Sequence, residues 1–313
     1  MTAIIECHEL VRIFSSTGVE VQALQGLDLT VETGELTAVI GASGSGKSTL
    51  LTILSGLDIP SAGRARVAGH DLLAMGRRER LSYRRNTVGF IWQQTTRNLL
   101  PYLTAAENVL LPLVMAGYPR AKRVARITEL LELLNVAELR DRVPGQLSGG
   151  QQQRVAVAVA LANSPDVLLA DEPTGELDEA NSRMVLDAFR GINETLGTTV
   201  LIVTHDAGVS DHVRRTMQIR DGRTSTEVLR RTSTDHTGRE HEVAEEFAVL
   251  DRVGRLQLPQ DYITQLAMRD RVRLGLEEDH VTVSPVRPEV AADSDAAEPD
   301  HDSADDEPAG EHP

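Results

Sequence analysis

A run of small residues followed by a lysine and two hydroxyl residues is the stretch with the clearest chemistry. Residues 41–49 read Gly-Ala-Ser-Gly-Ser-Gly-Lys-Ser-Thr and lie between the apolar runs 36–40 and 50–54. The order strand, glycine loop, helix is the P-loop pattern, in which backbone N–H groups wrap a phosphate chain. In that pattern Lys47 reaches the β- and γ-phosphates and the Ser48 hydroxyl binds Mg²⁺. A glycine-rich turn alone would predict only a tight turn, but this stretch predicts a nucleoside triphosphate site.

Two further apolar runs end in residues that suit the same chemistry. Val167–Ala170 precedes Asp171 and Glu172, and Thr199–Thr204 precedes His205. Ligands of open parallel sheets lie at the carboxyl ends of the strands. Neighbouring side chains of a strand point to opposite faces, so we expect Asp171 to support the metal and Glu172 to orient or deprotonate water. His205 can hydrogen-bond a terminal phosphate, although a lone histidine is more often structural.

A serine followed by two glycines predicts a helix start that faces an anion. Ser148 is placed as the N-cap of an alanine- and valine-rich helix, whose positive end suits a phosphate. A merely well-capped helix does not account for both Gly149 and Gly150. Phe14 is either a platform for a nucleotide base or a core aromatic, and the sequence leaves both readings open. Apolar residues at helical spacing between positions 103 and 139 predict a helical insertion.

Length and composition set the bounds for the whole chain. The chain has 313 residues, 41% of them apolar, which is enough for one large α/β domain and a smaller unit. It contains no run of about 18 uncharged apolar residues, so we expect no membrane span and no export. Cys7 is the only cysteine, as expected in a reducing cytoplasm. The net charge of −15 argues against broad nucleic-acid binding.

Together these pieces resemble the ATP-binding subunit of ATP-binding-cassette (ABC) transporters, over about residues 3–225. The motifs in order are the Walker A loop (41–49), the Q-loop (Gln93), the signature motif (147–151), the Walker B strand (167–172), the D-loop (Asp178) and the switch histidine (His205). The resemblance implies an α/β P-loop NTPase core with an antiparallel β subdomain and a helical insertion. It implies catalytic roles for Glu172, His205 and Gln93, and metal contacts from Ser48, Gln93 and Asp171. It implies nucleotide contacts from Phe14, Gly41, Ser43, Gly44, Gly46, Lys47, Ser48, Thr49, Ser148, Gly149, Gly150 and Asp178.

Short phrases look most like the branch that contains macrolide exporters and lipoprotein-release machinery. They are residues 98–101, 107–109 and 170–175, while Trp92, Glu176 and Val159 depart from the family pattern. The resemblance implies ATP and Mg²⁺ as cofactors, an integral membrane permease as partner, and a peripheral position at the cytoplasmic face of the membrane. Two copies would close head to tail on two ATP molecules, with Ser148 and Gly150 of one copy completing the P-loop site of the other.

The C-terminal part extends beyond a simple subunit of this kind. We expect an ATPase domain over 1–228, a linker over 229–246, a hairpin domain over 247–286 and a disordered acidic tail over 287–313. Alternation over 250–258, a helix over 260–268 and two more strands at 271–274 and 280–283 look like the AbrB-type swapped-hairpin fold. Residues 247–286 hold five basic and six acidic residues, so we expect a dimerisation clamp instead of a DNA reader.

Two readings stay open for the basic segment near the end of the expected ATPase domain. The arginines between residues 214 and 231 form either a solvated face or a contact with anionic lipid.

Two readings also stay open for the function of the whole chain. The first is an ATPase subunit that energises a permease for export or for lipid or lipoprotein cargo. The second is an ATP-switched regulator whose C-terminal hairpin binds DNA or a protein.

Overall fold

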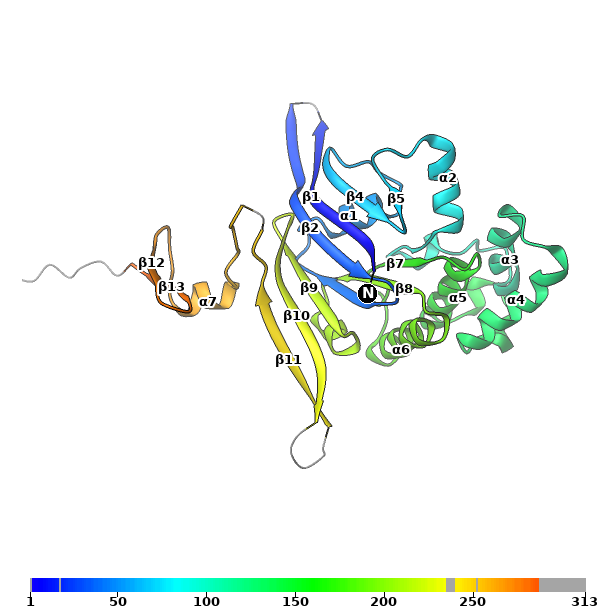
Figure 1. Cartoon of the computed structure of the whole chain (residues 1–313). Helices are drawn as coiled ribbons and strands as arrows, with labels where there is room; N and C mark the ends of the chain where they lie inside the picture. Colours follow the sequence, from blue (N-terminus) through cyan, green and yellow to red (C-terminus); the bar gives the residue numbers. More distant parts are fainter. Residues whose placement is uncertain (1, 17, 235–239, 252, 287–313) are drawn as a thin grey trace, which may run out of the picture. The chain divides into compact units, whose positions relative to one another are not determined.

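A seven-stranded sheet is the centre of the first of two units in this computed structural model (Figure 1). The structure describes residues 2–16, 18–234, 240–251 and 253–286. The units comprise residues 1–259 and 260–313. The strand order is β11-β10-β9-β3-β8-β7-β6. The strands are β3 (Leu36–Ile40), β6 (Val88–Ile91), β7 (Val167–Asp171), β8 (Thr199–Thr204), β9 (Arg215–Arg220), β10 (Arg223–Thr234) and β11 (Glu240–Ala248).

The parallel strands β3, β8, β7 and β6 of this sheet are almost wholly buried on both faces. These strands are short apolar runs, as expected where both faces of a sheet are covered. Alternate residues of β8 enter two different cores: Val200 and Ile202 pack with the helices, and Leu201 and Val203 pack with α1 and the second sheet. The period of two therefore sends each strand's side chains into both cores.

The second sheet is antiparallel and has the order β2-β1-β4-β5. Its strands are β1 (Ala3–Ser16), β2 (Val19–Glu32), β4 (Ala62–Val67) and β5 (His70–Asp71). The inward residues of β1 and β2, such as Ile5, Leu10 and Leu27, join the core that contains α1. The sheet confirms the expected antiparallel β subdomain.

Helices cover the parallel strands and form the expected insertion. Thr104 begins α3 with a capping box, because its hydroxyl accepts the Glu107 N–H and the Glu107 carboxylate accepts the Thr104 N–H. The insertion predicted over 103–139 is confirmed as α3 and α4. Among the described residues, no helix is both long and apolar enough to cross a membrane. The helices of this unit are α1 (Lys47–Leu54), α2 (Arg77–Asn86), α3 (Ala105–Met115), α4 (Arg120–Leu133), α5 (Gly149–Leu161) and α6 (Glu179–Leu196).

The segment expected as a linker, 229–246, lies mostly in a β-hairpin of the large sheet. β10 pairs antiparallel with β9, and β11 pairs antiparallel with β10. Polar composition suggested a linker, but β-branched residues recur along 223–234, and such side chains favour extended backbone. The first unit therefore continues past residue 228 to Pro259.

In the second unit, the described residues 260–286 form one short helix and one hairpin. The helix expected over 260–268 is present as α7 (Gln260–Gln265), and the last two expected strands are β12 (Val272–Leu276) and β13 (Val281–Pro285). The strand expected over 250–258 is wrong, because Asp251 accepts the Arg255 N–H and donates its own N–H to the Arg255 carbonyl, which closes a turn. The likeness to the AbrB-type fold is therefore not supported. The expected disordered tail, 287–313, lies outside the described residues.

Candidate functional site

The predicted polar residues follow three neighbouring strands at one edge of the large sheet. β8 lies between β3 and β7, with Ile40 beside Thr204 and Asp171 beside Val203. The P-loop leaves the end of β3, His205 follows β8, and β7 ends at Asp171, which Glu172 follows. Segments that are far apart in the sequence thus meet at the edge where open parallel sheets bind ligands.

Close packing around Gly41 and Gly46 explains why neither position carries a side chain. A Cβ at Gly41 would lie 2.3 Å from the Ile219 carbonyl oxygen, and one at Gly46 would lie 2.5 Å from the Ala23 carbonyl oxygen. Gly46 also has φ of 102°, which L side chains rarely adopt. Gly44 has φ of 81° and open space around its Cα, and Ser43 beside it is exposed. The loop is therefore packed at both ends and open at its tip.

Lys47 is the first residue of α1 and lies buried beneath this loop. Its ammonium group donates to the carbonyl oxygens of Gly41 at 2.8 Å and Ala42 at 2.9 Å. Burial lowers the pKa of Lys47, while the carboxylates of Glu172 and Asp171 act in the opposite direction. The lysine is thus a desolvated cation at the helix start, where an anion is favoured.

Ser48 and Asp171 place two oxygen atoms side by side. The Ser48 hydroxyl donates to the Asp171 carboxylate at 3.3 Å, and Thr49 lies half-buried in the same turn of α1. Burial raises the pKa of Asp171; the hydrogen bond from Ser48 lowers it, Glu172 raises it and Lys47 lowers it. Hydroxyl and carboxylate oxygens are ligands that Mg²⁺ prefers. The pair therefore fits part of a magnesium site.

Glu172 contacts two of the residues predicted to act with it. Its carboxylate lies 2.7 Å from His205 Nδ1 and accepts from Gln93 Nε2 at 3.4 Å. Glu172 was expected on the opposite strand face from Asp171, but it lies beyond β7 in the left-handed region, with φ of 45°. Such a conformation in a residue other than glycine is uncommon and clusters at functional sites. The left-handed backbone at Glu172, more than the alternation of side chains along a strand, therefore separates the two carboxylates.

The signature segment caps α5 as predicted. The Ser148 hydroxyl accepts the Gln151 N–H at 3.3 Å, and the Gln151 side chain accepts the Ser148 N–H at 2.9 Å. A Cβ at Gly150 would lie 2.4 Å from Asn181 Oδ1, whereas one at Gly149 would meet Leu177 at 3.2 Å. Packing against the start of α6 is therefore a reason for Gly150 that the sequence did not reveal.

The D-loop aspartate begins α6. Asp178 is the N-cap, because its carboxylate accepts the Asn181 N–H at 2.8 Å and Asn181 Nδ2–H at 2.7 Å. These hydrogen bonds, the backbone one first, lower the pKa of Asp178. A cavity of about 540 Å³ borders this loop and His205. The predicted nucleotide contact of Asp178 thus belongs to a residue that also fixes the position of α6.

Phe14 is exposed on β1, which favours the base-stacking reading over the core reading. Its ring is 42% exposed, and the Arg12 guanidinium lies 4.3 Å from the ring centroid. Asp58 holds that guanidinium through two hydrogen bonds, of 2.8 and 2.9 Å. Arg12 therefore holds the Phe14 ring in position, and the ring stays accessible to a ligand.

Sequence reasoning missed the residues that shape the segment after Gln93. Asn98 closes this segment, since its side chain accepts the Trp92 N–H and donates to the Trp92 carbonyl, both at 2.9 Å. Thr95 then donates to the buried Gln153 of α5 at 3.2 Å. An asparagine placed a few residues after a strand was the available signal, because its amide can replace backbone partners in a loop. Gln93 is thus tied to the signature helix within one chain.

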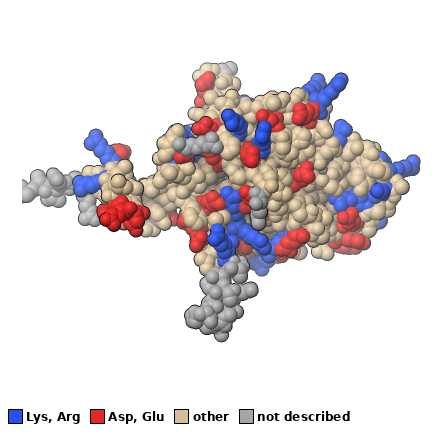
Figure 2. Space-filling view, in the orientation of Figure 1, with Lys and Arg blue, Asp and Glu red and all other residues tan. Residues whose placement is uncertain are grey.

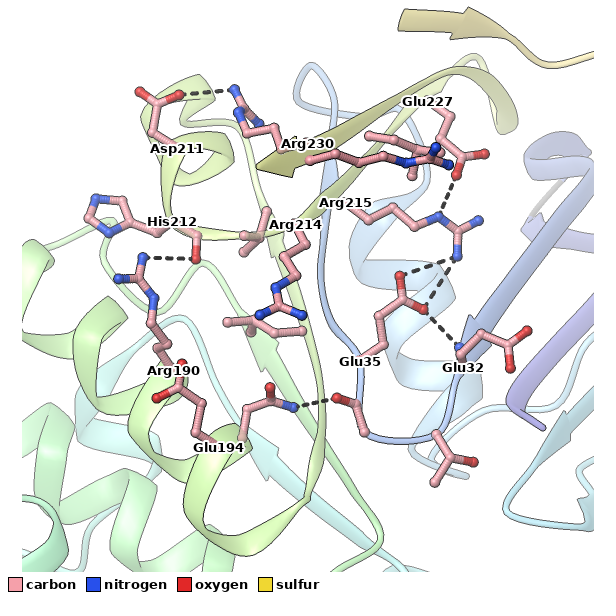
Figure 3. Close-up of a pocket in the computed structure, with 17 residues that line it drawn as sticks. Glu32, Glu35, Arg190, Glu194, Asp211, His212, Arg214, Arg215, Glu227 and Arg230 are labelled. Atoms are coloured by element: carbon pink, nitrogen blue, oxygen red, sulfur yellow. Dashed lines mark hydrogen bonds and ion pairs between the residues drawn. The ribbon is translucent and has the colours of Figure 1, made fainter. Parts of the chain in front are cut away.

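A cavity of about 1190 Å³ lies elsewhere, near the start of β3 (Figure 3). In Figure 3, Arg215 lies between Glu35 and Glu227, at 3.4 and 2.5 Å, and Arg230 reaches Asp211 at 2.9 Å. None of the predicted site residues lines this cavity. Arg215 and Arg230 are therefore mostly buried in ion pairs with carboxylates, which argues against a contact of these two side chains with lipid and also against a fully solvated face.

Comparisons with known proteins agree with this geometry. The family described as ABC transporter matches residues 24–175. The macrolide export ATP-binding/permease protein MacB of Rhodopseudomonas palustris is 49% identical over 218 residues, 70% of this chain and 33% of that protein. The lipoprotein-releasing system ATP-binding protein LolD of Geobacter metallireducens is 42% identical over 71% of this chain and 98% of LolD. The solved dimeric ATP-binding cassette MJ0796, bound to ADP and Pi, has a TM-score of 0.65 and 35% identity over 72% of this chain and 98% of that one.

The coverage differs between these relatives. The chain spans about a third of the length of the MacB protein, which carries further sequence, but it covers nearly all of LolD. The family profile includes the glycine loop, the signature segment and the two carboxylates after β7. With this identity and coverage, the chain belongs to the family of ABC transporter ATP-binding proteins.

Proposed function

We propose that the chain hydrolyses ATP to power a membrane permease of an envelope-facing transporter, for export or for lipid or lipoprotein cargo. The observation that carries the hydrolytic part is the meeting of Glu172 with His205 at 2.7 Å, at the same sheet edge as the glycine loop. A carboxylate held in this way beside a phosphate cradle is suited to act on a water molecule. The family relationship supports ATP as the nucleotide.

Each residue of the site has a task in this proposal. Backbone N–H groups of the loop and the Lys47 ammonium bind the β- and γ-phosphates, and Phe14 stacks on the base. Glu172 orients water or takes its proton, and His205 holds the Glu172 carboxylate in place. Gln93, 3.4 Å from Glu172, is placed to respond to the γ-phosphate. Thr49, Ser43 and Gly44 belong to the cradle.

Ser48 and Asp171 would hold Mg²⁺, with Gln93 as a further oxygen ligand. The 3.3 Å contact between Ser48 and Asp171 supports this assignment. Among the described residues no group of three or more His, Cys, Asp or Glu could hold a metal ion. We propose that the substrate's own phosphates supply the remaining oxygen ligands. When bound, the ion neutralises charge that develops on the phosphoryl oxygens.

A second copy of the chain would complete each site. The capped start of α5 presents backbone donors of Gly149 and Gly150, and we propose that it binds the γ-phosphate held by another copy's P-loop. The relative MJ0796 forms a dimer. We propose that such a partner approaches Asp178, the N-cap of α6, and the cavity that His205 lines. ATP binding would close the dimer and hydrolysis would reopen it.

The permease is proposed to be a separate chain. MacB combines an ATP-binding part with a permease, whereas LolD is an ATP-binding protein of about this chain's matched length. We therefore place the chain at the cytoplasmic face of a membrane, attached through its permease. The segment around Trp92 and Gln93, together with the helical insertion, would transmit the closure of the dimer to the permease. The hydrogen bond between Thr95 and Gln153 supports this, because it joins the segment after Gln93 to α5. The ATP-switched regulator is not favoured, because the likeness that suggested its hairpin is not supported.

Replacing Glu172 by glutamine tests the hydrolytic assignment. Glu172→Gln keeps the shape and the Lys47 cradle but removes the base, so we expect ATP turnover to fall at least about 100-fold. ATP affinity should stay within about threefold of the wild-type value, which is ~0.7 kcal/mol. Trp92, the only tryptophan, precedes Gln93 and reports binding through its fluorescence. Glu138→Gln, an exposed change of the same chemistry, is the control.

Wild-type turnover in Glu172→Gln would overturn the catalytic role of this residue. The transport part has its own test, which is purification from detergent-solubilised membranes with and without a crosslinker. A permease that follows the chain supports coupling to transport, and its absence in both preparations would remove that part while leaving ATP hydrolysis in place.

A further inference from the structure

The hairpin of the second unit has one face made of apolar side chains. β12 and β13 pair in regular register, with Leu274 opposite Val283 and Gly275 opposite Thr282. Directly opposed residues of an antiparallel pair lie on the same face of a sheet. One face therefore carries Thr282 and Ser284 with Arg273, and the other is apolar throughout. The apolar face consists of Val272, Leu274, Leu276, Val281, Val283 and Pro285.

Within the described residues of its own unit, nothing covers this face. Leu274 is 69% exposed, Leu276 86% and Val281 61%, and no residue from 260 to 286 is buried. A two-stranded hairpin alone is marginally stable in water, because it lacks a second layer to cover its apolar side. The helix α7 has no buried residue either. The apolar face therefore calls for a layer from outside the unit.

Charge is separated along the length of the hairpin. The open end, residues 269–273, carries three arginines and one aspartate. The turn carries Glu277, Glu278 and Asp279, and the Glu277 N–H donates to the His280 carbonyl at 2.9 Å, which closes it. Figure 2 shows a compact group of acidic side chains on this unit. The hairpin is thus positive at one end and negative at the other.

We propose that the apolar face packs on the same face of a second copy, with the two hairpins antiparallel. A two-fold axis perpendicular to the strands places the acidic turn of each copy over the arginines of the other. A two-fold axis along the strands would instead place both acidic turns together, and like charges at close range are unfavourable. Charge complementarity therefore selects one of the two symmetric arrangements, and a two-fold contact buries both faces at once.

A second copy fits this face better than a lipid surface does. Anionic headgroups would repel the carboxylates of Glu277, Glu278 and Asp279, which lie at one end of the same hairpin. The face is small, so we expect a weak contact. Its use rests on the proposed function: two cassettes that separate after each hydrolysis stay at high effective concentration when a second contact joins them.

The first experiment compares two neighbouring positions on opposite faces of β13. Nucleotide-free full-length protein is studied by sedimentation velocity over a range of concentrations. Val283→Asn places an amide on the apolar face, and we expect the dimer Kd to rise at least about tenfold, or ~1.4 kcal/mol. Ser284→Asn makes a similar change on the polar face and should leave the Kd within about twofold, or ~0.4 kcal/mol.

The second experiment uses charge reversal and mixing. Arg271→Glu/Arg273→Glu makes both ends of the hairpin acidic, and Glu277→Arg/Glu278→Arg makes both ends basic. Each variant alone should be monomeric where the wild type is dimeric. An equimolar mixture should form a heterodimer with at least about tenfold lower Kd than either variant alone, ~1.4 kcal/mol.

Three outcomes in the association experiments, and a fourth with vesicles, would overturn this proposal. One is a nucleotide-free wild type that stays monomeric over the whole concentration range. Another is equal dimerisation of Val283→Asn and Ser284→Asn, and the third is a mixture that associates no better than its components. Binding of the wild type to anionic vesicles that Val283→Asn abolishes would assign the face to lipid instead. ATP turnover of Val283→Asn, measured separately, keeps this result distinct from a failure of the proposed function.

Discussion

Asp171 is buried beside Glu172, and this arrangement costs stability in the absence of ligand. Its pKa lies above the ordinary value of 3.8, chiefly because of burial. The native state therefore binds a proton that the unfolded chain releases. By linkage, the stability of the wild type falls as the pH rises from 3.8 through the native pKa, and above that pKa the loss is complete. The Asp171 carboxylate, which is suited to bind a cation, therefore lowers the stability of the fold when no cation is bound.

Asp171→Asn should accordingly stabilise the protein at neutral pH. Asparagine does not titrate, so we expect a higher free energy of unfolding than in the wild type at pH 7, and a difference that shrinks as the pH falls toward 3.8. Urea unfolding without nucleotide and with EDTA measures this difference across pH. Asp187→Asn, the same chemical change at an exposed position of α6, is the control. A variant less stable than the wild type at pH 7 would contradict the expectation.

Lys47 can be tested against the only other lysine. Lys47→Ala removes the buried cation that we propose binds the phosphate chain, and we expect ATP affinity to fall at least about tenfold, ~1.4 kcal/mol. Lys122 is exposed on α4, so Lys122→Ala should bind ATP as the wild type does. A titration followed by Trp92 fluorescence measures both variants. Equal affinities would count against the role of Lys47 in the cradle.

At the scale of elements, the sequence determined the strands and loops of the site well because their signals are local. The apolar runs before Gly41, Asp171 and His205 identified β3, β7 and β8, and their parallel order placed all three ends together. Contacts between distant segments were not visible in this way. The approach of Asn181 to Gly150 and the bond between Thr95 and Gln153 depend on how α5 packs, which no local pattern contains.

In the C-terminal extension, the expectations from local sequence patterns differ from the structure in two places. The expectation of a linker over 229–246 rests on the predominance of polar residues, yet β10 pairs with β9 and β11 pairs with β10, and this pairing satisfies backbone groups whatever the side chains are. The strand expected over 250–258 had the alternation but also Asp251 and Gly254, and these form a turn with φ of 81° at the glycine. Turn chemistry prevailed over alternation there.

The packing of α5 on α6 yields a prediction for the signature segment. Gly150→Ala forces a Cβ toward Asn181 Oδ1, so we expect a loss of about 1–3 kcal/mol of unfolding free energy from overpacking. In the double variant Gly150→Ala/Asn181→Ala, the free energy of unfolding should return most of the way to the wild-type value. Gly149→Ala, which meets only the end of Leu177, should cost less. Urea unfolding compares the three. If the second change restores nothing, close approach to Asn181 is not the reason for the glycine.

For the whole molecule, the site predicts that ATP controls association. Glu172→Gln retains the cradle and the capped α5 but does not turn over ATP, so Mg²⁺-ATP should shift it to a dimer in light scattering, and ADP should not. The variant Glu172→Gln/Val283→Asn should still respond to ATP, because the cassette contact is separate from the hairpin contact. An ATP-insensitive Glu172→Gln would contradict the composite site.

The edge strand β11 has a consequence for how the protein behaves in solution. It ends the large sheet, and a row of unpaired backbone groups invites sheet growth from one molecule to the next. Glu245 and Glu246 are exposed on this strand, and their charge opposes such growth. Acidification toward the sequence pI of about 5.1 reduces the net negative charge on the molecule. Stocks kept well above that pH should therefore stay clear and monodisperse, and mildly acidic ones should turn turbid.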